Sequence, residues 1–304
     1  MRARSIVDAL LADSTPCQGN ATAAAPRTET FRASRRLRAR FVAYYFDYWS
    51  QQSESAAERR AAQWIERRVL RRSDAVIVPN EFLAQALRDH YGVLCTVVRN
   101  SCEPASGDRG TSIRRAARGT RSVVYTGAVY EANLDAFRNL LAAIDSARLD
   151  AKLHIYSAQS KHDLTAQGLS GPLEVHHHRP AHEVLDVQRR ADVLFLPLGF
   201  QTRYPRIIHT SSPAKVCEYL GSGRPILVHA PRGSFVTEYF REYGCGVVVD
   251  KPDPALLGRA LRQLFDDDRL CASVTAAACE RARADYDVET SRASFARVVG
   301  LTQS

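Results

Sequence analysis

The stretch Ser211-Ser-Pro-Ala-Lys-Val-Cys-Glu-Tyr-Leu-Gly-Ser-Gly-Arg-Pro225, followed by the apolar run Ile226-Leu-Val-His-Ala230, carries the clearest structural signals in the chain. Ser212 can cap a helix, and Pro213 suits a first helical turn, where its missing N–H is not needed. Two glycines and Pro225 then stop the helix before the apolar run. The pattern predicts a polar loop, a short helix and a buried strand.

One face of this helix combines polar groups in an unusual order. Ser212, Lys215 and Glu218 lie three residues apart and therefore share a face. A lysine in the first turn opposes the helix dipole, which favours negative charge there. The conflict disappears if a phosphate binds at this end, and Glu218 could then accept hydrogen bonds from the vicinal hydroxyls of a ribose. A capped surface helix with both charges in solvent explains the spacing equally well.

The segment resembles the donor-binding helix of GT-B glycosyltransferases, especially their group 1 (GT4-like) branch. In that branch a Ser/Pro-x-Lys-x-x-Glu-Tyr-Leu-x-x-Gly-x-Pro run holds a nucleotide sugar. The resemblance extends over roughly residues 70–285. Its other motifs are Asp74-Ala-Val-Ile-Val-Pro-Asn-Glu-Phe-Leu83, Val124-Tyr-Thr-Gly-Ala128 and Ala191-Asp-Val-Leu-Phe-Leu-Pro-Leu198.

The resemblance implies an enzyme that moves a sugar from a nucleoside diphosphate donor to a hydroxyl acceptor, in bacterial polysaccharide or glycoconjugate synthesis. The acceptor would be a saccharide or a lipid-linked saccharide. No cofactor is expected, because the nucleotide sugar is itself a substrate. Two alternatives stay open, since fold alone does not separate them: a truncated protein that binds the donor with little or no turnover, and a sugar-nucleotide epimerase of the same architecture.

By resemblance, the donor site uses the loops at the carboxyl ends of the second domain's strands. Gly127 ends the first of these strands and lets the diphosphate approach the backbone. Ser211, Ser212 and Lys215 would hold the diphosphate. Glu218 would bind the ribose, and the nucleobase would lie near His178.

Two expected features of the family are missing here. No arginine or lysine follows closely after Gly127, so Arg203 and Arg206 are candidates to neutralise the diphosphate beside Lys215, although a solvent-facing role explains each arginine as well. Many retaining relatives also carry a second glutamate eight positions before Glu218. That position is Thr210, so retention and inversion both stay open.

The acceptor side offers no clear catalytic base. The first histidine in the chain is His90, and Asp47, after a tyrosine-rich run, is the only candidate carboxylate. An aspartate that closes a strand turn explains Asp47 equally well. No metal site is expected either, because adjacent strand residues alternate faces and at most two of the histidines at 176–178 could converge.

Strands alternate with helices along the chain, which predicts parallel sheets in an α/β fold. We expect two doubly wound Rossmann-like domains of GT-B type, the N-terminal one incomplete. The second domain should contain six strands, at residues 122–126, 153–157, 173–177, 193–198, 225–229 and 246–249. The predicted divisions are an irregular or mobile segment (1–35), a partial acceptor-side domain (36–102), a linker (103–120), the nucleotide-sugar-binding domain (121–285) and a C-terminal helix returning to the first domain (286–304).

Charge is distributed very unevenly. Residues 1–121 contain 21 basic and 12 acidic side chains, which accounts for the whole net charge of +9. Such a region could bind an anionic membrane surface, or be a solvated arginine-rich surface. No nucleic-acid motif is present. The seven scattered cysteines indicate a reducing compartment, and no run of about 20 apolar residues suggests a membrane span. The expected location is cytoplasmic, with possible attachment to the inner membrane face.

Overall fold

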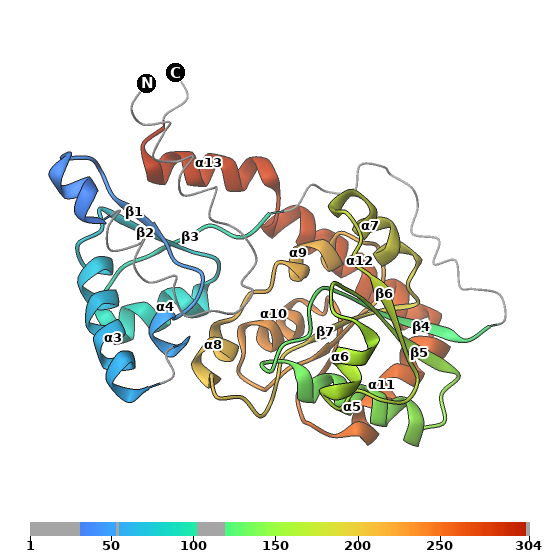
Figure 1. The fold of residues 1–304 in the computed structure, drawn as a ribbon. Helices are drawn as coiled ribbons and strands as arrows, with labels where there is room; N and C mark the ends of the chain where they lie inside the picture. Colours follow the sequence, from blue (N-terminus) through green and yellow to red (C-terminus); the bar gives the residue numbers. More distant parts are fainter. Residues whose placement is uncertain (1–30, 53–54, 102–118, 302–304) are drawn as a thin grey trace.

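The computed structural model describes residues 31–52, 55–101 and 119–301. Its strands form two parallel sheets that lie side by side, each with its own helices (Figure 1). In the first part the elements are β1 (Val42–Tyr44), the 3-10 helix η1 (Trp49–Gln52), α3 (Ala56–Leu70), β2 (Ala75–Val78), α4 (Glu81–Tyr91) and β3 (Thr96–Val97). In the second part they are β4 (Arg121–Thr126), α5 (Leu134–Ser146), β5 (Ala151–Ser157), α6 (Lys161–Ala166), β6 (Leu173–His177), α7 (Ala181–Arg190), β7 (Val193–Pro197), α8 (Pro205–Thr210), α9 (Lys215–Leu220), β8 (Ile226–His229), α10 (Phe235–Tyr243), β9 (Val247–Val249), α11 (Pro254–Asp266), α12 (Asp268–Asp285) and α13 (Val288–Val299).

The larger sheet has six parallel strands in the order β6-β5-β4-β7-β8-β9. The chain first adds strands on one side of β4 and then returns to add β7, β8 and β9 on the other side. Loops that leave β4 and β7 therefore diverge to opposite faces, and this opens a crevice at the carboxyl ends of the strands. The expected six strands are confirmed, each within two residues of its predicted bounds at either end.

Helices cover both faces of the larger sheet at its central strands, as the fully buried strands β7 and β8 require. One core joins α5 and α11 to side chains such as Val123 and Phe195. The other joins α9, α10 and α12 to their sequence neighbours Val124 and Leu194. Consecutive strand residues thus alternate between two buried layers.

The smaller sheet has three parallel strands in the order β1-β2-β3. Its core is a single cluster in which Val76 and Val78 of β2 pack against Leu83 and Leu87 of α4. Asn80 caps the start of α4, because its side-chain oxygen accepts a hydrogen bond from Leu83 N at 2.9 Å. Both sheets are parallel and belong to an α/β architecture, as the sequence predicts.

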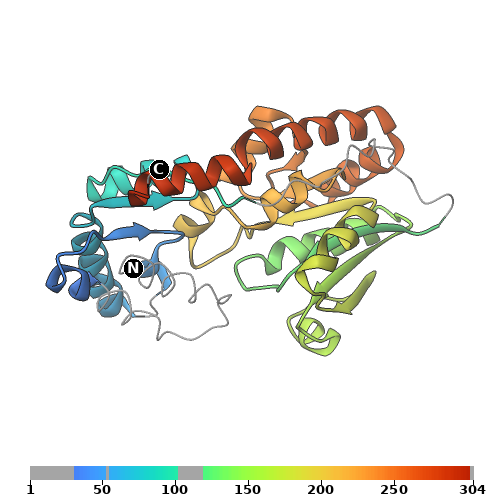
Figure 2. The same ribbon diagram turned by 90° about the horizontal axis from the view of Figure 1, so that it is seen from above.

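The last helix lies away from the sheet that precedes it in the chain. α13 contacts β2, and Ser291 Oγ donates a hydrogen bond to the carbonyl of Arg99 at 3.4 Å. The rings of Phe295 and Tyr44 lie 6.2 Å apart. Figures 1 and 2 both show α13 running along the smaller sheet.

Several local predictions were wrong. Ser212 does not cap α9: the helix begins at Lys215, and its N-cap position is Ala214, which makes no side-chain bond. Ser211 and Ser212 instead follow α8, a six-residue helix that was not predicted. The tyrosine-rich run before Asp47 forms the three-residue strand β1, which pairs with β2 up to Tyr44 and is only partly buried.

Some expectations fall largely outside the described residues. The segment at 1–30 and most of the expected linker, at 102–118, belong to this group. Residues 31–36, at the end of the segment expected to be irregular, are helical. Within the described ranges, no helix combines the length and the apolar character that crossing a membrane would require.

Candidate functional site

A cavity of about 390 Å³ opens at the carboxyl end of β4, at the crevice that the strand order creates. Parts of the chain that are far apart in sequence line it. Thr126 and Gly127 come from the end of β4, His178 follows β6, and Lys215 and Glu218 come from α9. Four of the predicted site residues, namely Gly127, His178, Lys215 and Glu218, therefore meet in one cavity.

Lys215 lies directly against Gly127. A Cβ atom built on Gly127 would be 2.7 Å from Lys215 Nζ, and the φ of Gly127 is +131°, a backbone conformation that other residues rarely adopt. The ammonium group also lies 5.0 Å from the centre of the Tyr125 ring, a cation–π distance. The close packing of α9 on the β4 loop thus places a positive charge beside the backbone of a glycine that is only partly buried.

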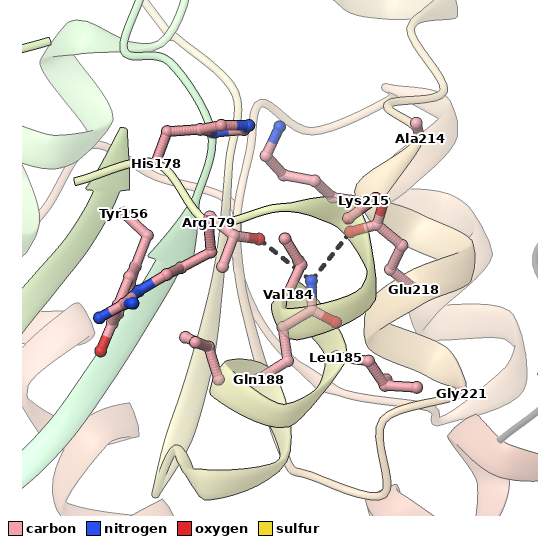
Figure 3. Close-up of a pocket in the computed structure, with 14 residues that line it drawn as sticks. Tyr156, His178, Arg179, Val184, Leu185, Gln188, Ala214, Lys215, Glu218 and Gly221 are labelled. Atoms are coloured by element: carbon pink, nitrogen blue, oxygen red, sulfur yellow. Dashed lines mark hydrogen bonds between the residues drawn. The ribbon is translucent and has the colours of Figure 1, made fainter. Parts of the chain in front are cut away.

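Glu218 is held by a buried amide that the sequence did not single out. Gln188 Nε2 donates to Glu218 Oε2 at 2.8 Å and to Thr126 Oγ1 at 3.1 Å (Figure 3). Gln188 is fully buried, and its Oε1 has no hydrogen-bond partner within the described ranges. The bond fixes one oxygen of Glu218 and leaves the other available to a ligand. Gln188 comes from α7, thirty residues before Glu218, so no local pattern indicated the pairing.

A second buried contact ties α9 to β4. Tyr219 OH accepts a hydrogen bond from Thr126 N at 3.2 Å. The Tyr219 side chain is fully buried, and burial raises the pKa of its hydroxyl well above the usual value. The phenol therefore stays neutral and acts as a fixed polar link, which holds Lys215 and Glu218 in place over the end of β4.

The wall around His178 contains two further side chains. Tyr156 and Arg179 line the cavity beside His178 (Figure 3). Arg179 also pairs with Glu183 at 3.5 Å, with both side chains about half exposed. An aromatic ring, an imidazole and a guanidinium at one end of the cavity could stack on a planar base and bind its polar edge.

The two candidate arginines do not lie in this cavity. Arg203 makes a two-pronged pair with Glu131, with distances of 2.9 and 2.5 Å, on the exposed surface. Its hydrogen bonds lower the pKa of Glu131. Arg206 instead lines a second cavity, of about 340 Å³.

The second cavity lies between α4 of the first part and α8 of the second part. It is lined by Ala86 and His90 of α4 and by Arg206 and His209 of α8, with Tyr48 at its side. α8 was not predicted, so the meeting of His90, Arg206 and His209 was not foreseen. Asp47, the candidate base, lines neither of the two cavities, and neither do Ser211 and Ser212.

Comparison with known proteins identifies both parts of the chain. A glycosyl transferase 4-like domain matches residues 11–100, and the glycosyl transferases group 1 domain matches residues 120–267. No curated protein sequence matches the chain.

Several solved structures share the fold at low identity. Anabaena Alr3699/HepE in complex with UDP-glucose has a TM-score of 0.65 and 14% identity, over 91% of this chain and 76% of that chain. WaaG, a glycosyltransferase involved in lipopolysaccharide biosynthesis, has a TM-score of 0.64 and 14% identity, over 94% and 85%. A mutant of S. aureus TarM, in complex with fondaparinux, alpha-GlcNAc-glycerol and UDP, has a TM-score of 0.63 and 12% identity, over 86% of this chain but only 51% of that chain.

Proposed function

Because this chain belongs to the group 1 glycosyltransferases of GT-B fold, we propose that it transfers a sugar from a nucleoside diphosphate donor to a hydroxyl acceptor. The observation that carries this proposal is the meeting of Gly127, Lys215 and Glu218 in one cavity at the strand-order reversal. This is where open parallel sheets bind nucleotides.

Each of these residues has a distinct role in the proposed reaction. Lys215 binds the diphosphate beside Gly127, where no Cβ blocks the approach, and stabilises the negative charge that develops on it as the sugar leaves. Glu218, fixed by Gln188, accepts hydrogen bonds from the ribose. His178 and its neighbours contact the nucleobase. A uridine diphosphate donor is favoured, because HepE and TarM were solved with UDP or UDP-glucose.

Calorimetry with UDP tests the donor site directly. Lys215→Met removes the charge and keeps the apolar stem, and Glu218→Gln keeps the shape. Each should weaken UDP binding by roughly 1–3 kcal/mol, the range for hydrogen bonds to charged groups. Lys161→Met, at the exposed start of α6, is the matched control and should bind UDP normally. Unchanged affinity in both site variants would refute the donor-site assignment.

Donor binding without turnover is the second candidate function. Among the described residues, the smaller sheet has only three strands, and catalysis requires an acceptor held firmly against the donor. A panel of acceptors with radiolabelled donor separates the two functions. Multiple turnovers would establish a transferase and direct the search for the base to Asp47, whereas UDP binding with no transfer or hydrolysis would favour the binder. Interconversion of free UDP-sugars would reveal an epimerase.

We also propose that the arginine-rich first part binds an anionic membrane surface, where a lipid-linked acceptor would lie. Trp64 of α3 is 63% exposed, and Arg68 stacks on its ring at 5.4 Å. Arg60, Arg67 and Arg71 lie three, four or seven positions from Trp64, so they share its exposed face. An indole among arginines suits the headgroup region of a bilayer.

Sedimentation with vesicles tests the membrane proposal. Binding should require anionic lipid and fall steeply with added salt, because exposed charges are screened beyond about 8 Å at physiological ionic strength. At any given salt concentration, Trp64→Ser should bind anionic vesicles more weakly than the unaltered chain does. Equal binding to neutral and anionic vesicles would contradict it.

We further propose that residues 36–102 and 121–285 form separate domains, with the helix near the C-terminus completing the first. The separate sheets and the contacts between α13 and β2 support this division.

A further inference from the structure

Three side chains able to bind a metal ion meet at the edge of the larger sheet, where His154 lies on β5 and both Glu174 and His176 lie on the edge strand β6. One ligand atom from each lies within 4.8 Å of the other two. The strand register pairs His154 with Glu174 and Tyr156 with His176, so all these side chains project from the same face of the sheet. All three candidate ligands are partly exposed, so an ion in solution could reach them.

Two of the three spacings between ligand atoms are close to those of a tetrahedral site. His154 Nδ1 lies 3.0 Å from His176 Nε2 and 3.6 Å from Glu174 Oε2. Metal–ligand bonds of about 2.0–2.1 Å place the corners of a tetrahedral zinc site roughly 3.3–3.4 Å apart. These two distances lie on either side of that value, and the ligand atoms of Glu174 and His176 lie within 4.8 Å of each other, so side-chain rotations would have to bring the set to its final spacing.

We propose that His154, Glu174 and His176 form a binding site for a first-row divalent metal ion, best matched by Zn²⁺, which would join the edge strand β6 to β5. Two imidazoles and one carboxylate are a ligand set typical of zinc. Ca²⁺ and Mg²⁺ prefer sites made only of oxygen ligands. Water would complete the coordination, and the site is separate from the Gly127, Lys215 and Glu218 group.

One neighbour competes with the metal. Lys152 Nζ lies 2.6 Å from Glu174 Oε1, with both side chains almost half exposed. Its positive charge would have to move aside when a dication binds, so Lys152 should weaken the site. This gives the proposal a directional test, because removal of Lys152 should strengthen metal binding rather than weaken it.

The site also adjoins the larger cavity. The rings of His176 and Tyr156 stack with their centres 4.4 Å apart, and Tyr156 lines the cavity. A metal on His176 would therefore restrain one wall of the cavity without contacting a ligand bound in it.

Metal titration of the full chain tests the proposal. After chelator treatment and dialysis, Co²⁺ should bind in a single saturable step, with the visible absorption bands of tetrahedral nitrogen and oxygen coordination, and Zn²⁺ should displace it. Zn²⁺ should also raise the midpoint of thermal unfolding, because it binds only the folded site. Glu174→Gln and His176→Ala should each weaken binding at least about tenfold, whereas Lys152→Met should strengthen it.

The control is His177→Ala, which removes an exposed imidazole from the same strand but on the opposite face. It should leave Co²⁺ affinity and spectrum unchanged. The proposal is overturned if the unaltered chain shows no saturable binding, if Glu174→Gln and His176→Ala bind Co²⁺ as the unaltered chain does, or if His177→Ala alone abolishes binding. Glu174→Gln keeps the side-chain shape, so it decides the question even if His176→Ala folds poorly.

Discussion

The two sheets reach stability in different ways. The larger one has six strands and two apolar cores, whereas the smaller has three strands and one small cluster. Beside the smaller one lies a buried carboxylate, Glu66 of α3, which accepts hydrogen bonds from Tyr45, Tyr91 and Ser50. A sheet with little apolar area to bury depends on a few polar links, and each link therefore has a large share of its stability.

The smaller sheet also depends on its neighbour. Arg99 follows β3 and inserts its guanidinium among the rings of Phe235, Tyr239 and Tyr286 from the larger part, at 5.5–5.7 Å. It pairs with Glu81 at 2.9 Å as well. Because the smaller sheet relies on a few polar contacts and the larger one on two apolar cores, single polar substitutions should destabilise the smaller sheet more.

The largest effect is expected from Glu66→Ala. Three buried hydroxyl groups would lose their acceptor, which costs about 3 kcal/mol or more. Hydrogen exchange should then rise throughout β1, β2 and α4, while the larger sheet stays protected and UDP affinity stays unchanged. Glu66→Gln, which retains one acceptor oxygen, should have a smaller effect. Equal loss of protection in both sheets would show that the smaller sheet does not depend on Glu66 more than the larger sheet does.

Acid should weaken the larger sheet through His229. This side chain is fully buried, donates from Nδ1 to the Val249 carbonyl at 2.9 Å, and accepts from Asn139. Burial lowers the pKa of His229 from 6.5 to about 4. The unfolded chain therefore binds a proton at a higher pH than the folded chain does. Stability should fall by roughly 2–3 kcal/mol as the pH drops from about 6.5 to 4.

Denaturant unfolding followed across that pH range measures this effect. His229→Gln should lower stability at neutral pH, because the packing changes, but it should also flatten the slope between pH 6.5 and 4. An unchanged slope in the variant would assign the acid sensitivity to other groups.

Arg99→Ala should separate the two regions. Loss of the desolvated cation–π contacts and of the Glu81 pair should cost about 2 kcal/mol. Scanning calorimetry should then resolve an early transition of the smaller sheet from a later one of the larger sheet. Arg88→Ala, an exposed arginine on α4, is the control and should leave the profile unchanged. A single transition in both variants would mean that Arg99 does not couple the regions.

The smallest effect is expected from Asn80→Ser. The asparagine side chain caps α4 and also donates to the Thr210 carbonyl at 2.8 Å, across the boundary between the regions. Serine keeps the cap but cannot reach Thr210, so only that one bond is lost, at about 1 kcal/mol. Asn80→Ala loses both bonds and should cost about twice as much. Equal midpoints of denaturation for the two variants would show that the cap contributes nothing.

Much of the architecture could be predicted because its signals are local. The six strands of the larger sheet are apolar runs separated by amphipathic helices, and the cap at Asn80 needs only the residues beside it. The helix before Pro225 was also found, but its start was placed too early. Ser212 and Pro213 form a good local start signal, yet the helix begins at Lys215, whose side chain packs against Gly127.

The missed contacts of the cavity and of the sheet edge join distant segments. Gln188 was not singled out because its partners, Thr126 and Glu218, lie 62 and 30 residues away. The convergence of Glu174 with His154 and His176 follows from the register of β5 and β6, which no sequence pattern specifies.

The position of α13 has a consequence for how the protein is made. The smaller sheet emerges from the ribosome first, but the helix that contacts β2 is made after the entire larger sheet. Synthesis proceeds from the N-terminus at about 5–20 residues per second. Until the rest of the chain has been made, the smaller sheet lacks both that helix and the rings that surround Arg99. The region that is translated first should therefore be the last to complete its native packing.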